Sequence, residues 1–503
     1  MDNFERFIVE NEGADTGRLA MARKEWPVPE DPCLAGLDAR GLAISTIESR
    51  RRLRKKVPEW AAEAGLVYPS TLCAEQCSSS DTARYKAGIA TRVIAVTELA
   101  EVTGGKGASA GAALRQVGEL VEPQRPADGI IAQRPARRKG RIADLTGGLG
   151  VDSWAFSEVA ETVIYNEMNP ELAAAARHNF NVLGADNITV KNFEATPETI
   201  KEILGGSEGT TKSNQESKQS TNDILRDFIP DIIFLDPARR DSAGKKVFLL
   251  EDCTPDVLNM LPGLFEESRF ILLKLSPMAD ITMAVERLDR TYESFLQETS
   301  GDGWNGQWVR EIHVVASGGE CKELLILMDR EWNGRYSLTC REDGKTMTFS
   351  QEEISTAKAT YLDSTFARII FEPGKSITKA GAFNALCGRF GLTKLARFTH
   401  LYTISDPLSD SELQERIKGF KDFGKVYLVK EILPLNKASM KEVGRRYPHS
   451  EVSAKNIPMT SDELRRRLKV SSGDDAHIFG ARIETPYSED NYLIVTESRG
   501  QKH

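Results

Sequence analysis

The sequence predicts an α/β protein in which a central parallel sheet is flanked by a helical N-terminal domain and a small α+β C-terminal domain. From Arg141 onward, short apolar runs alternate with helix-like stretches, which is typical of parallel strands covered by helices. Before that point, residues 1 to about 120 show apolar positions at helical spacing. The length of 503 residues also exceeds the ~300 residues that one hydrophobic core usually serves, so we expect several domains.

The central domain is expected at residues 126–335. Its strands are the apolar runs RIADL, TVIYN, ITVKN, DIIFLD and FILLKL. Two further strands, VREIHVVAS and KELLILMD, are joined by Gly318 and Gly319, which suits an antiparallel hairpin at a sheet edge. Residues 205–222 contain too few apolar side chains to order themselves, so we expect a mobile surface loop there.

The flanking regions are a helical domain at residues 1–125 and an α+β region at 336–503 that could form two lobes. The helical expectation rests on segments such as TARYKAGIATRVIAVTELAEV. The C-terminal region mixes strand-like pieces with a helix-like one. The strand-like pieces are FGKVYLVKEIL, HIFGARI and NYLIVTES, and the helix-like one is SAKNIPMTSDELRRRL.

Composition and charge indicate a folded, water-soluble protein, with 40% hydrophobic and 28% charged residues. The net charge of -8 does not itself indicate a nucleic-acid binder, although such an average can conceal one basic face. The acidic start lacks the apolar segment of a signal peptide, and no stretch has the length of a membrane span, so we expect a cytoplasmic protein without membrane contact. The close pair Cys73 and Cys77 lacks matching ligands, so we expect no metal.

A glycine-rich turn follows the first central strand in DLTGGLGVDS, residues 144–153. Glycines let a ligand approach a backbone that carries no Cβ, and such turns cradle nucleotide-like molecules. The dinucleotide pattern GxGxxG fits poorly, because Ser153 occupies the place of the third glycine. The second strand delivers Glu167, whose carboxylate can accept hydrogen bonds from both hydroxyls of a ribose.

This segment resembles motif I of Rossmann-like (class I) methyltransferases, in which glycines stand four and six positions after an acidic residue. Here these are Gly148, Gly150 and Asp144, and Thr146 stands where that family often has another glycine. The resemblance implies S-adenosylmethionine as cofactor, with its ribose at Glu167 and its adenine near the end of the third strand. The expected cofactor-binding residues are Asp144, Thr146, Gly147, Gly148, Gly150, Asp152, Glu167, Met168, Phe193 and Glu194.

The fourth strand ends in DPARRD, which holds the expected catalytic residues Asp236, Pro237 and Arg239. The segment resembles the Asp-Pro-Pro motif of nucleic-acid methyltransferases, but Ala238 and Arg239 replace the aromatic residue of those that act on base amines. Asp236 is expected to orient or deprotonate the nucleophile. Arg239 is expected to hold a phosphate or steady the turn, unless it pairs with acidic residues at the surface.

The fifth strand supplies Lys274, Ser276 and Pro277, where five-position uridine methyltransferases need a cysteine nucleophile. We therefore expect direct methyl transfer to nitrogen or oxygen, promoted mainly by proximity and alignment.

The whole chain is similar to a bacterial family of methyltransferases with a THUMP-like C-terminal domain. The similarity rests on CAEQCSSSDTARYKA, DLTGGLGVDS, LDPARRD and RRYPHSEVSAKNIPMTSDELRRRLKV. It implies a Rossmann-like methyltransferase domain and a C-terminal module related to domains that bind RNA. Basic clusters at residues 50–56, 134–141 and 465–469 fit a phosphate backbone, or else the solvated faces of helices.

Three functions remain open at this point. The first is a methyltransferase of transfer or ribosomal RNA, and the second is a methyltransferase of a small molecule or a protein. The third is an RNA-binding protein that keeps the cofactor pocket without catalysis, against which the intact Asp236 and Glu167 argue. A polar cluster before the core either covers the active site or caps and solvates a helix; it comprises Glu75, Gln76, Ser78, Ser79, Thr82, Tyr85 and Lys86.

Overall fold

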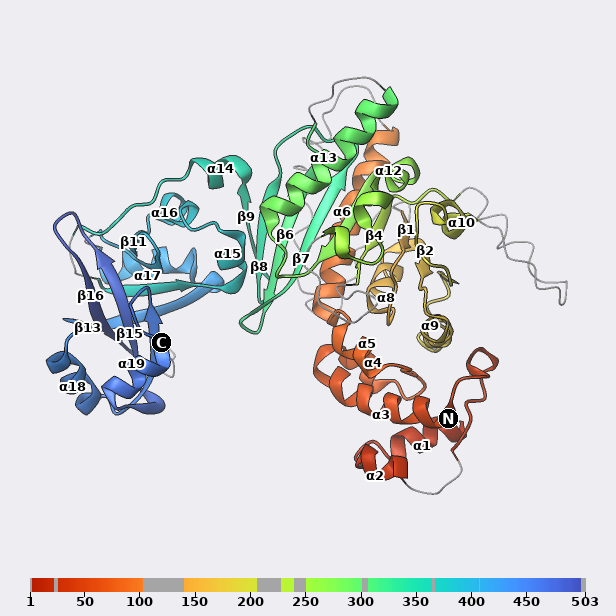
Figure 1. The fold of residues 1–503 in the computed structure, drawn as a ribbon, viewed down its shortest axis with the longest axis horizontal. Coiled ribbons are helices and arrows are strands. Elements are labelled where there is room, and N and C mark those ends of the chain that lie inside the picture. Colours follow the sequence, from red (N-terminus) through yellow and green to blue (C-terminus); the bar gives the residue numbers. More distant parts are fainter. Residues whose placement is uncertain are drawn as a thin grey trace. The chain divides into compact units, whose positions relative to one another are not determined.

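A computed structural model describes residues 2–21, 26–102, 140–205, 228–238, 250–300, 306–363, 367–406 and 408–498 (Figure 1). The chain forms two compact units. The first comprises residues 1–310 and 326–334, and the second comprises 311–325 and 335–503. These units do not test the domain limits predicted at residues 125 and 335, which stay predictions. Among the helices of the described ranges, none is long and apolar enough to cross a membrane.

The N-terminal part of the first unit is helical, as the sequence predicts. Its longest helix, α6, contacts β1 and β4 of the sheet that follows. Ile94 of this helix fills the space beside Gly140, where a Cβ would lie only 2.3 Å from the isoleucine side chain. The helices are α1 (Asn3–Glu10), α2 (Thr16–Met21), η1 (Pro32–Leu34), α3 (Ala39–Lys56), α4 (Pro58–Ala62), α5 (Thr71–Gln76) and α6 (Ser80–Val102).

The five predicted central strands are present and parallel. They are β1 (Gly140–Asp144), β2 (Ala160–Asn166), β3 (Ile188–Lys191), β4 (Ile232–Leu235) and β5 (Phe270–Leu275). Their order is β3-β2-β1-β4-β5, so the direction of strand addition reverses between β1 and β4. Ligands of such sheets bind beyond the carboxyl ends of the strands at this reversal.

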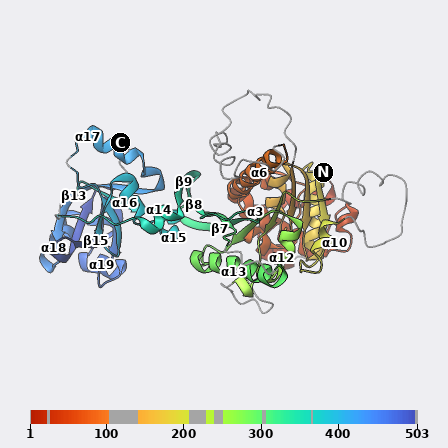
Figure 2. The same cartoon turned by 90° about the horizontal axis from the view of Figure 1, so that it is seen from above.

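Helices cover both faces of this sheet, which explains why β4 and β5 are buried along their whole length (Figure 2). One face carries α6 and α8, and the other carries α12 and α13. The connecting helices are α8 (Val151–Ser157), α9 (Pro170–Val182), α10 (Ile200–Leu204), η2 (Leu250–Asp252), α12 (Val257–Glu267) and α13 (Ile281–Ser300). The loop predicted at 205–222 lies, apart from residue 205, outside the described residues.

The predicted hairpin exists as β6 (Val309–Ser317) and β7 (Glu320–Asp329), joined by Gly318 and Gly319 with φ of +61° and +79°. Its predicted place at a sheet edge is wrong. Strand β8 (Ser337–Glu342) pairs in parallel with β6, and β9 (Lys345–Ser350) pairs antiparallel with β8. The sheet therefore has nine strands in the order β3-β2-β1-β4-β5-β7-β6-β8-β9.

The second unit contains a seven-stranded sheet in the order β11-β12-β10-β13-β16-β15-β14. The three predicted strand segments form β13, β15 and β16. The strands are β10 (Ile369–Pro373), β11 (Thr393–Ala396), β12 (Thr399–Thr403), β13 (Gly424–Pro434), β14 (His449–Lys455), β15 (Ser471–Glu484) and β16 (Glu489–Thr496). The helices are α14 (Gln351–Thr356), α15 (Lys375–Ala380), α16 (Ala385–Phe390), α17 (Asp410–Lys418), η3 (Lys421–Phe423), α18 (Lys437–Arg446) and α19 (Ser461–Leu468).

The helix predicted over residues 453–468 is shorter than expected. Residues 453–455 end β14, and α19 begins at Ser461. Pro458 cannot donate a helical hydrogen bond, and Thr460 caps α19 by accepting a hydrogen bond from the Glu463 amide at 3.2 Å. These two residues set the start of the helix.

Candidate active site

The glycine-rich loop between β1 and α8 takes a conformation that requires glycine. Gly148 and Gly150 have φ of +54° and +93°, in the region that side chains other than glycine rarely adopt. A Cβ at Gly150 would lie 2.7 Å from the Phe180 ring, and one at Gly147 would lie 2.1 Å from the Tyr165 ring. These two glycines therefore let the loop pack closely on β2 and α9.

Gly148 differs from its two neighbours because its missing Cβ faces open space. The nearest atom to a Cβ there would be the carbonyl oxygen of Thr146, at 4.0 Å. The Gly148 carbonyl is fixed by the Tyr165 hydroxyl, which donates to it at 2.5 Å. The loop is thus held rigidly while this one side stays accessible to a ligand.

Glu167, just after β2, lies beside the open side of the loop. Its carboxylate accepts hydrogen bonds from the amides of Gly148 at 2.9 Å and Asn169 at 2.8 Å. Burial raises the pKa of Glu167 above its ordinary value. The Cys73 thiol of α5 lies near enough that, after burial itself, the Glu167 charge helps to raise the pKa of Cys73. The N-terminal helices therefore reach this end of the sheet.

Asn166, at the end of β2, is a residue that sequence reasoning missed. Its side chain donates to the carbonyls of Leu145 at 3.1 Å and Phe193 at 3.0 Å, and accepts from the Phe193 amide at 3.0 Å. It is 1% exposed. Asn166 therefore ties together the segments after β1 and β3, which brings Phe193 to the same edge as Glu167. The signal was a polar residue ending an apolar strand, directly before Glu167.

The remaining predicted cofactor residues differ in exposure. Met168 is 56% exposed, Glu194 is exposed, and Phe193 is half-buried. Asp144 is fully buried and accepts hydrogen bonds from the Thr146 amide at 3.1 Å and the Ser153 hydroxyl at 2.6 Å. Its carboxylate thus braces the loop against α8.

The end of β4 is joined directly to the glycine loop. The Asp236 amide donates to the Thr146 hydroxyl at 2.6 Å, so the threonine that replaces a glycine of motif I has a structural role. Pro237 is buried. The Ala238 amide donates to the Thr254 carbonyl at 2.7 Å, and the Thr254 amide donates back to the Ala238 carbonyl at 3.3 Å. Arg239, predicted as catalytic, lies outside the described residues.

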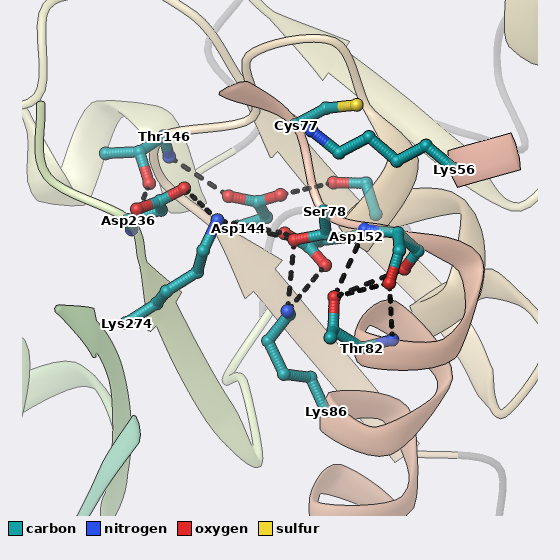
Figure 3. A network of polar contacts seen from close by, with 12 residues as sticks. Lys56, Cys77, Ser78, Thr82, Lys86, Asp144, Thr146, Asp152, Asp236 and Lys274 are labelled. Carbon is teal, nitrogen blue, oxygen red and sulfur yellow. Dashed lines mark hydrogen bonds and ion pairs between the residues drawn. The ribbon is translucent and has the colours of Figure 1, made fainter. Parts of the chain in front are cut away.

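Two buried lysines connect Asp236 to the N-terminal helices (Figure 3). Lys274 of β5 donates to Asp236 Oδ2 at 2.5 Å and to the Ser78 hydroxyl at 3.3 Å. Lys86 of α6 pairs with Asp152 Oδ1 at 3.1 Å and donates to the same hydroxyl at 3.0 Å. Ser78 in turn donates to Asp152 Oδ2 at 2.7 Å.

This network, formed by Ser78, Lys86, Asp152, Asp236 and Lys274, is almost closed to solvent. The lysine side chains are 0% and 4% exposed, whereas that of Asp236 is 32% exposed. Buried charges are tolerated when they are paired and hydrogen-bonded, as here. Asp236 is therefore the member of the network that can meet a substrate.

The polar cluster predicted before the core splits into two groups with different contacts. Ser78 and Lys86 enter the network at Asp236. Ser79 and Thr82 instead cap α6, since the Ser79 amide donates to the Thr82 hydroxyl at 3.1 Å and the Thr82 amide donates to the Ser79 hydroxyl at 3.2 Å. Glu75 faces solvent, where it pairs with Arg52 at 2.6 Å.

The first two predicted basic clusters differ in what the structure describes of them. Arg50 and Arg54 both pair with Glu12, and Arg51 donates to the Glu12 and Ala14 carbonyls, so much of the 50–56 cluster holds helices together. Residues 134–139 of the second cluster lie outside the described residues. Across the described ranges, no group of three or more His, Cys, Asp or Glu side chains is arranged to hold a metal ion.

Comparisons with known proteins agree with this architecture. Residues 370–410 match the family described as a ferredoxin-like domain, and residues 424–498 match the family described as THUMP domain-like. A crystal structure from Porphyromonas gingivalis, provisionally named a methyltransferase, is 25% identical. It aligns over 99% of this chain and 97% of its own, with a TM-score of 0.68. Among curated proteins, no sequence matches this chain significantly.

Two further solved structures are a precorrin-6y methyltransferase from Geobacter metallireducens and TrmN from Thermus thermophilus. The first is 14% identical, over 39% of this chain and 81% of that one, with a TM-score of 0.24. The second is 14% identical, over 38% and 44%, with a TM-score of 0.25. The full-length match and the sheet order show a methyltransferase-like fold across the whole chain, with a Rossmann-like methyltransferase core and a THUMP-like C-terminal domain.

Proposed function

We propose that this protein is an S-adenosylmethionine-dependent methyltransferase that acts on RNA. The observation that carries the proposal is the meeting of three strand ends, those of β2, β1 and β4, at the point where the sheet order reverses. The open side of Gly148, the Glu167 carboxylate and Asp236 all lie there, linked by the hydrogen bonds of Gly148 to Glu167 and of Asp236 to Thr146. Polar groups converging at a strand-end crevice are typical of a ligand site.

The residues at this edge fit the cofactor. Glu167 would accept hydrogen bonds from the ribose hydroxyls, and Phe193 and Glu194 would contact the adenine. The open side of Gly148 gives the cofactor access to the loop. When bound, the cofactor supplies a methyl group on a positively charged sulfur. Asp236, at the next strand end, would hold the atom that receives this methyl group.

The support for an RNA substrate comes from the C-terminal unit. Residues 424–498 match a THUMP-like family, and this segment includes α18 and α19. Arg445, Arg466 and Lys469 are exposed there, and none of them forms an ion pair within the described residues. Exposed cations without carboxylate partners are available to phosphate groups.

Calorimetric titration with S-adenosylmethionine tests cofactor binding. We expect Glu167→Ala to weaken binding strongly, because the variant loses the ribose contact. Glu161→Ala is a matched control, since Glu161 is an exposed residue at the opposite end of the same strand. A wild-type protein that does not bind the cofactor, or a Glu167→Ala variant that binds it normally, would contradict the cofactor site.

Methyl transfer from labelled cofactor to total RNA, taken from cells that lack the protein, tests the substrate. Label is expected in RNA with the wild type. A variant with Asp236→Ala should lose transfer while keeping cofactor affinity, because Asp236 faces the acceptor. The triple change Arg445→Glu, Arg466→Glu and Lys469→Glu should weaken RNA binding without changing cofactor binding. Label found only in metabolites or protein would refute the RNA substrate, and binding without any transfer would favour a non-catalytic protein.

A further inference from the structure

We infer that the acceptor atom is a hydroxyl oxygen, which in RNA is the ribose hydroxyl, and that Lys274 is the positioning residue that suits the site to it. The inference rests on the proposed function. It starts from the ammonium group of Lys274, which is buried under the acceptor edge and lies 2.5 Å from Asp236 Oδ2.

The charge of the site discriminates between nitrogen and oxygen acceptors. A neutral amine becomes positively charged as it takes up a methyl group, and a bare carboxylate would stabilise that charge. Here Lys274 already neutralises Asp236, so the pair offers little compensation to a new cation. A hydroxyl oxygen instead gains negative character as its proton leaves, and a nearby ammonium group stabilises that change. The Lys274–Asp236 pair therefore favours oxygen.

The described part of the turn after Asp236, which is Pro237 and Ala238, presents no aromatic ring to a base amine. Enzymes that methylate base amines hold the base against an aromatic ring, whereas this chain has Ala238. The Ala238 amide donates to the Thr254 carbonyl and the Ala238 carbonyl accepts from the Thr254 amide, so the donor is already used and the acceptor is partly used. A hydroxyl group needs only one acceptor for its proton, and Asp236 provides it.

The orientation of Asp236 fits this task. Lys274 engages Oδ2, and no described residue forms a hydrogen bond or ion pair with Oδ1, so Oδ1 is the oxygen that can accept a hydrogen bond from a substrate hydroxyl. The side chain is 32% exposed, which gives the substrate access. Lys274 is itself held by Ser78, so the N-terminal segment helps to set the direction of the carboxylate.

The chemical step balances with these groups. A lone pair of the hydroxyl oxygen forms the new bond to the methyl carbon while the carbon–sulfur bond breaks. The bonding electrons go to the sulfur, which becomes an uncharged thioether. The hydroxyl proton passes to the Asp236 carboxylate and then to water. The products are a methyl ether, S-adenosylhomocysteine and one proton.

The test identifies the methylated atom in labelled RNA by digestion to nucleosides and mass spectrometry. We expect the wild-type protein to place the label on ribose oxygen. This modification also makes the adjacent phosphodiester bond resistant to alkali, because the 2′-hydroxyl that attacks the phosphate is blocked. Label on a base nitrogen would overturn the hydroxyl inference and leave the proposed function standing. Absence of transfer to RNA would refute the RNA methyltransferase itself.

Variants at Lys274 test the positioning role. Lys274→Met should lower kcat by about 100-fold, the size of effect seen when one stabilising donor is removed, with cofactor affinity nearly unchanged. Lys274→Arg keeps the charge and should restore part of kcat. The exposed Lys201 on α10 allows a matched control, Lys201→Met, which should behave as the wild type. Equal kcat in wild type and Lys274→Met, or equal losses in Lys274→Met and Lys274→Arg, would overturn the role of the charge.

Discussion

Replacing Asp144 with asparagine should remove a pH dependence of stability that this one carboxyl group imposes on the first unit. Asp144 is 0% exposed, at the end of β1. Burial is the main cause that raises the pKa of Asp144 to about 7; the charges of Asp152 and Asp236 act in the same direction, and the hydrogen bond from Ser153 acts against them. In the unfolded chain the same group has its ordinary pKa of about 4.

The direction and the size of the pH effect on the free energy of unfolding follow from the difference between the folded and unfolded pKa values of Asp144. Between pH 4 and pH 7 the folded protein keeps a proton that the unfolded chain has released, so the free energy of unfolding falls as the pH rises through this interval. Above pH 7 the contribution of Asp144 is constant. Each pKa unit corresponds to about 1.4 kcal/mol, so the wild type should lose about 3 kcal/mol between pH 5 and pH 8 through this group. The Asp144→Asn variant should not.

Urea unfolding followed by tryptophan fluorescence measures this effect, since all six tryptophans fall within the first unit. Between pH 5 and pH 8, the unfolding free energy of the wild type should fall by about 3 kcal/mol relative to that of the Asp144→Asn variant. Asp186→Asn, at an exposed position of the same unit, should show no such drift. Parallel curves for Asp144→Asn and the wild type would refute the reasoning that burial penalises this charge.

Three further sets of substitutions test contacts of the glycine loop and of the buried network. Thr146→Val should lower kcat at least 10-fold, because it leaves the Asp236 amide without its acceptor. Thr146→Ser keeps the hydroxyl and should not lower kcat in this way. Equal losses of kcat in the two variants, measured in steady-state assays, would contradict the link between β1 and β4. Gly150→Ala should destabilise the first unit by several kcal/mol in urea unfolding, while Gly148→Ala should cost ~1–2 kcal/mol and mainly weaken cofactor binding by calorimetry. Lys86→Met should cost up to ~3–5 kcal/mol, because it removes the close partner of the buried Asp152 carboxylate and leaves it only the more distant Lys274, at 4.0 Å. A loss below ~1 kcal/mol in the same unfolding assay would count against that pairing.

The parts of the fold that could be predicted from the sequence are those whose signal is local. Strands β4 and β5 are buried on both faces, so their sequences are nearly continuous apolar runs, and such runs can be recognised as buried strands from the sequence alone. Strands β8 and β9 have the mixed sequences SLTCRE and KTMTFS and gave no such signal. They are strands because β8 pairs with β6 from Glu311 to Ala316, and sequence patterns do not reveal a partner of that kind.

The candidate site likewise contains residues with a local sequence signal and residues that come together only in the fold. The glycine loop, Glu167 and Asp236 follow their strands directly, so a motif of a few residues was enough to predict them. Lys274 gave a weaker local sign, a lysine within a wholly buried strand, which is rare unless the charge has a partner. Its contact with Ser78 joins residues 196 positions apart, and nothing in either segment alone indicates the other.

The N-terminal helices are therefore part of the site in a physical sense. Val67 and Asn179 of α9 exchange two hydrogen bonds, of 2.9 and 2.8 Å, which dock the helical segment onto the core. That docking places Ser78 between the two buried lysines and lets its one hydroxyl donate to Asp152 while accepting from both ammonium groups. Without this hydroxyl, Lys274 would keep Asp236 as its close partner but lose the contact that fixes its own direction. The loss of this hydroxyl would act directly on the acceptor side of the site, through Lys274 and Asp236. The N-terminal segment also borders the cofactor side, where Cys73 lies near Glu167.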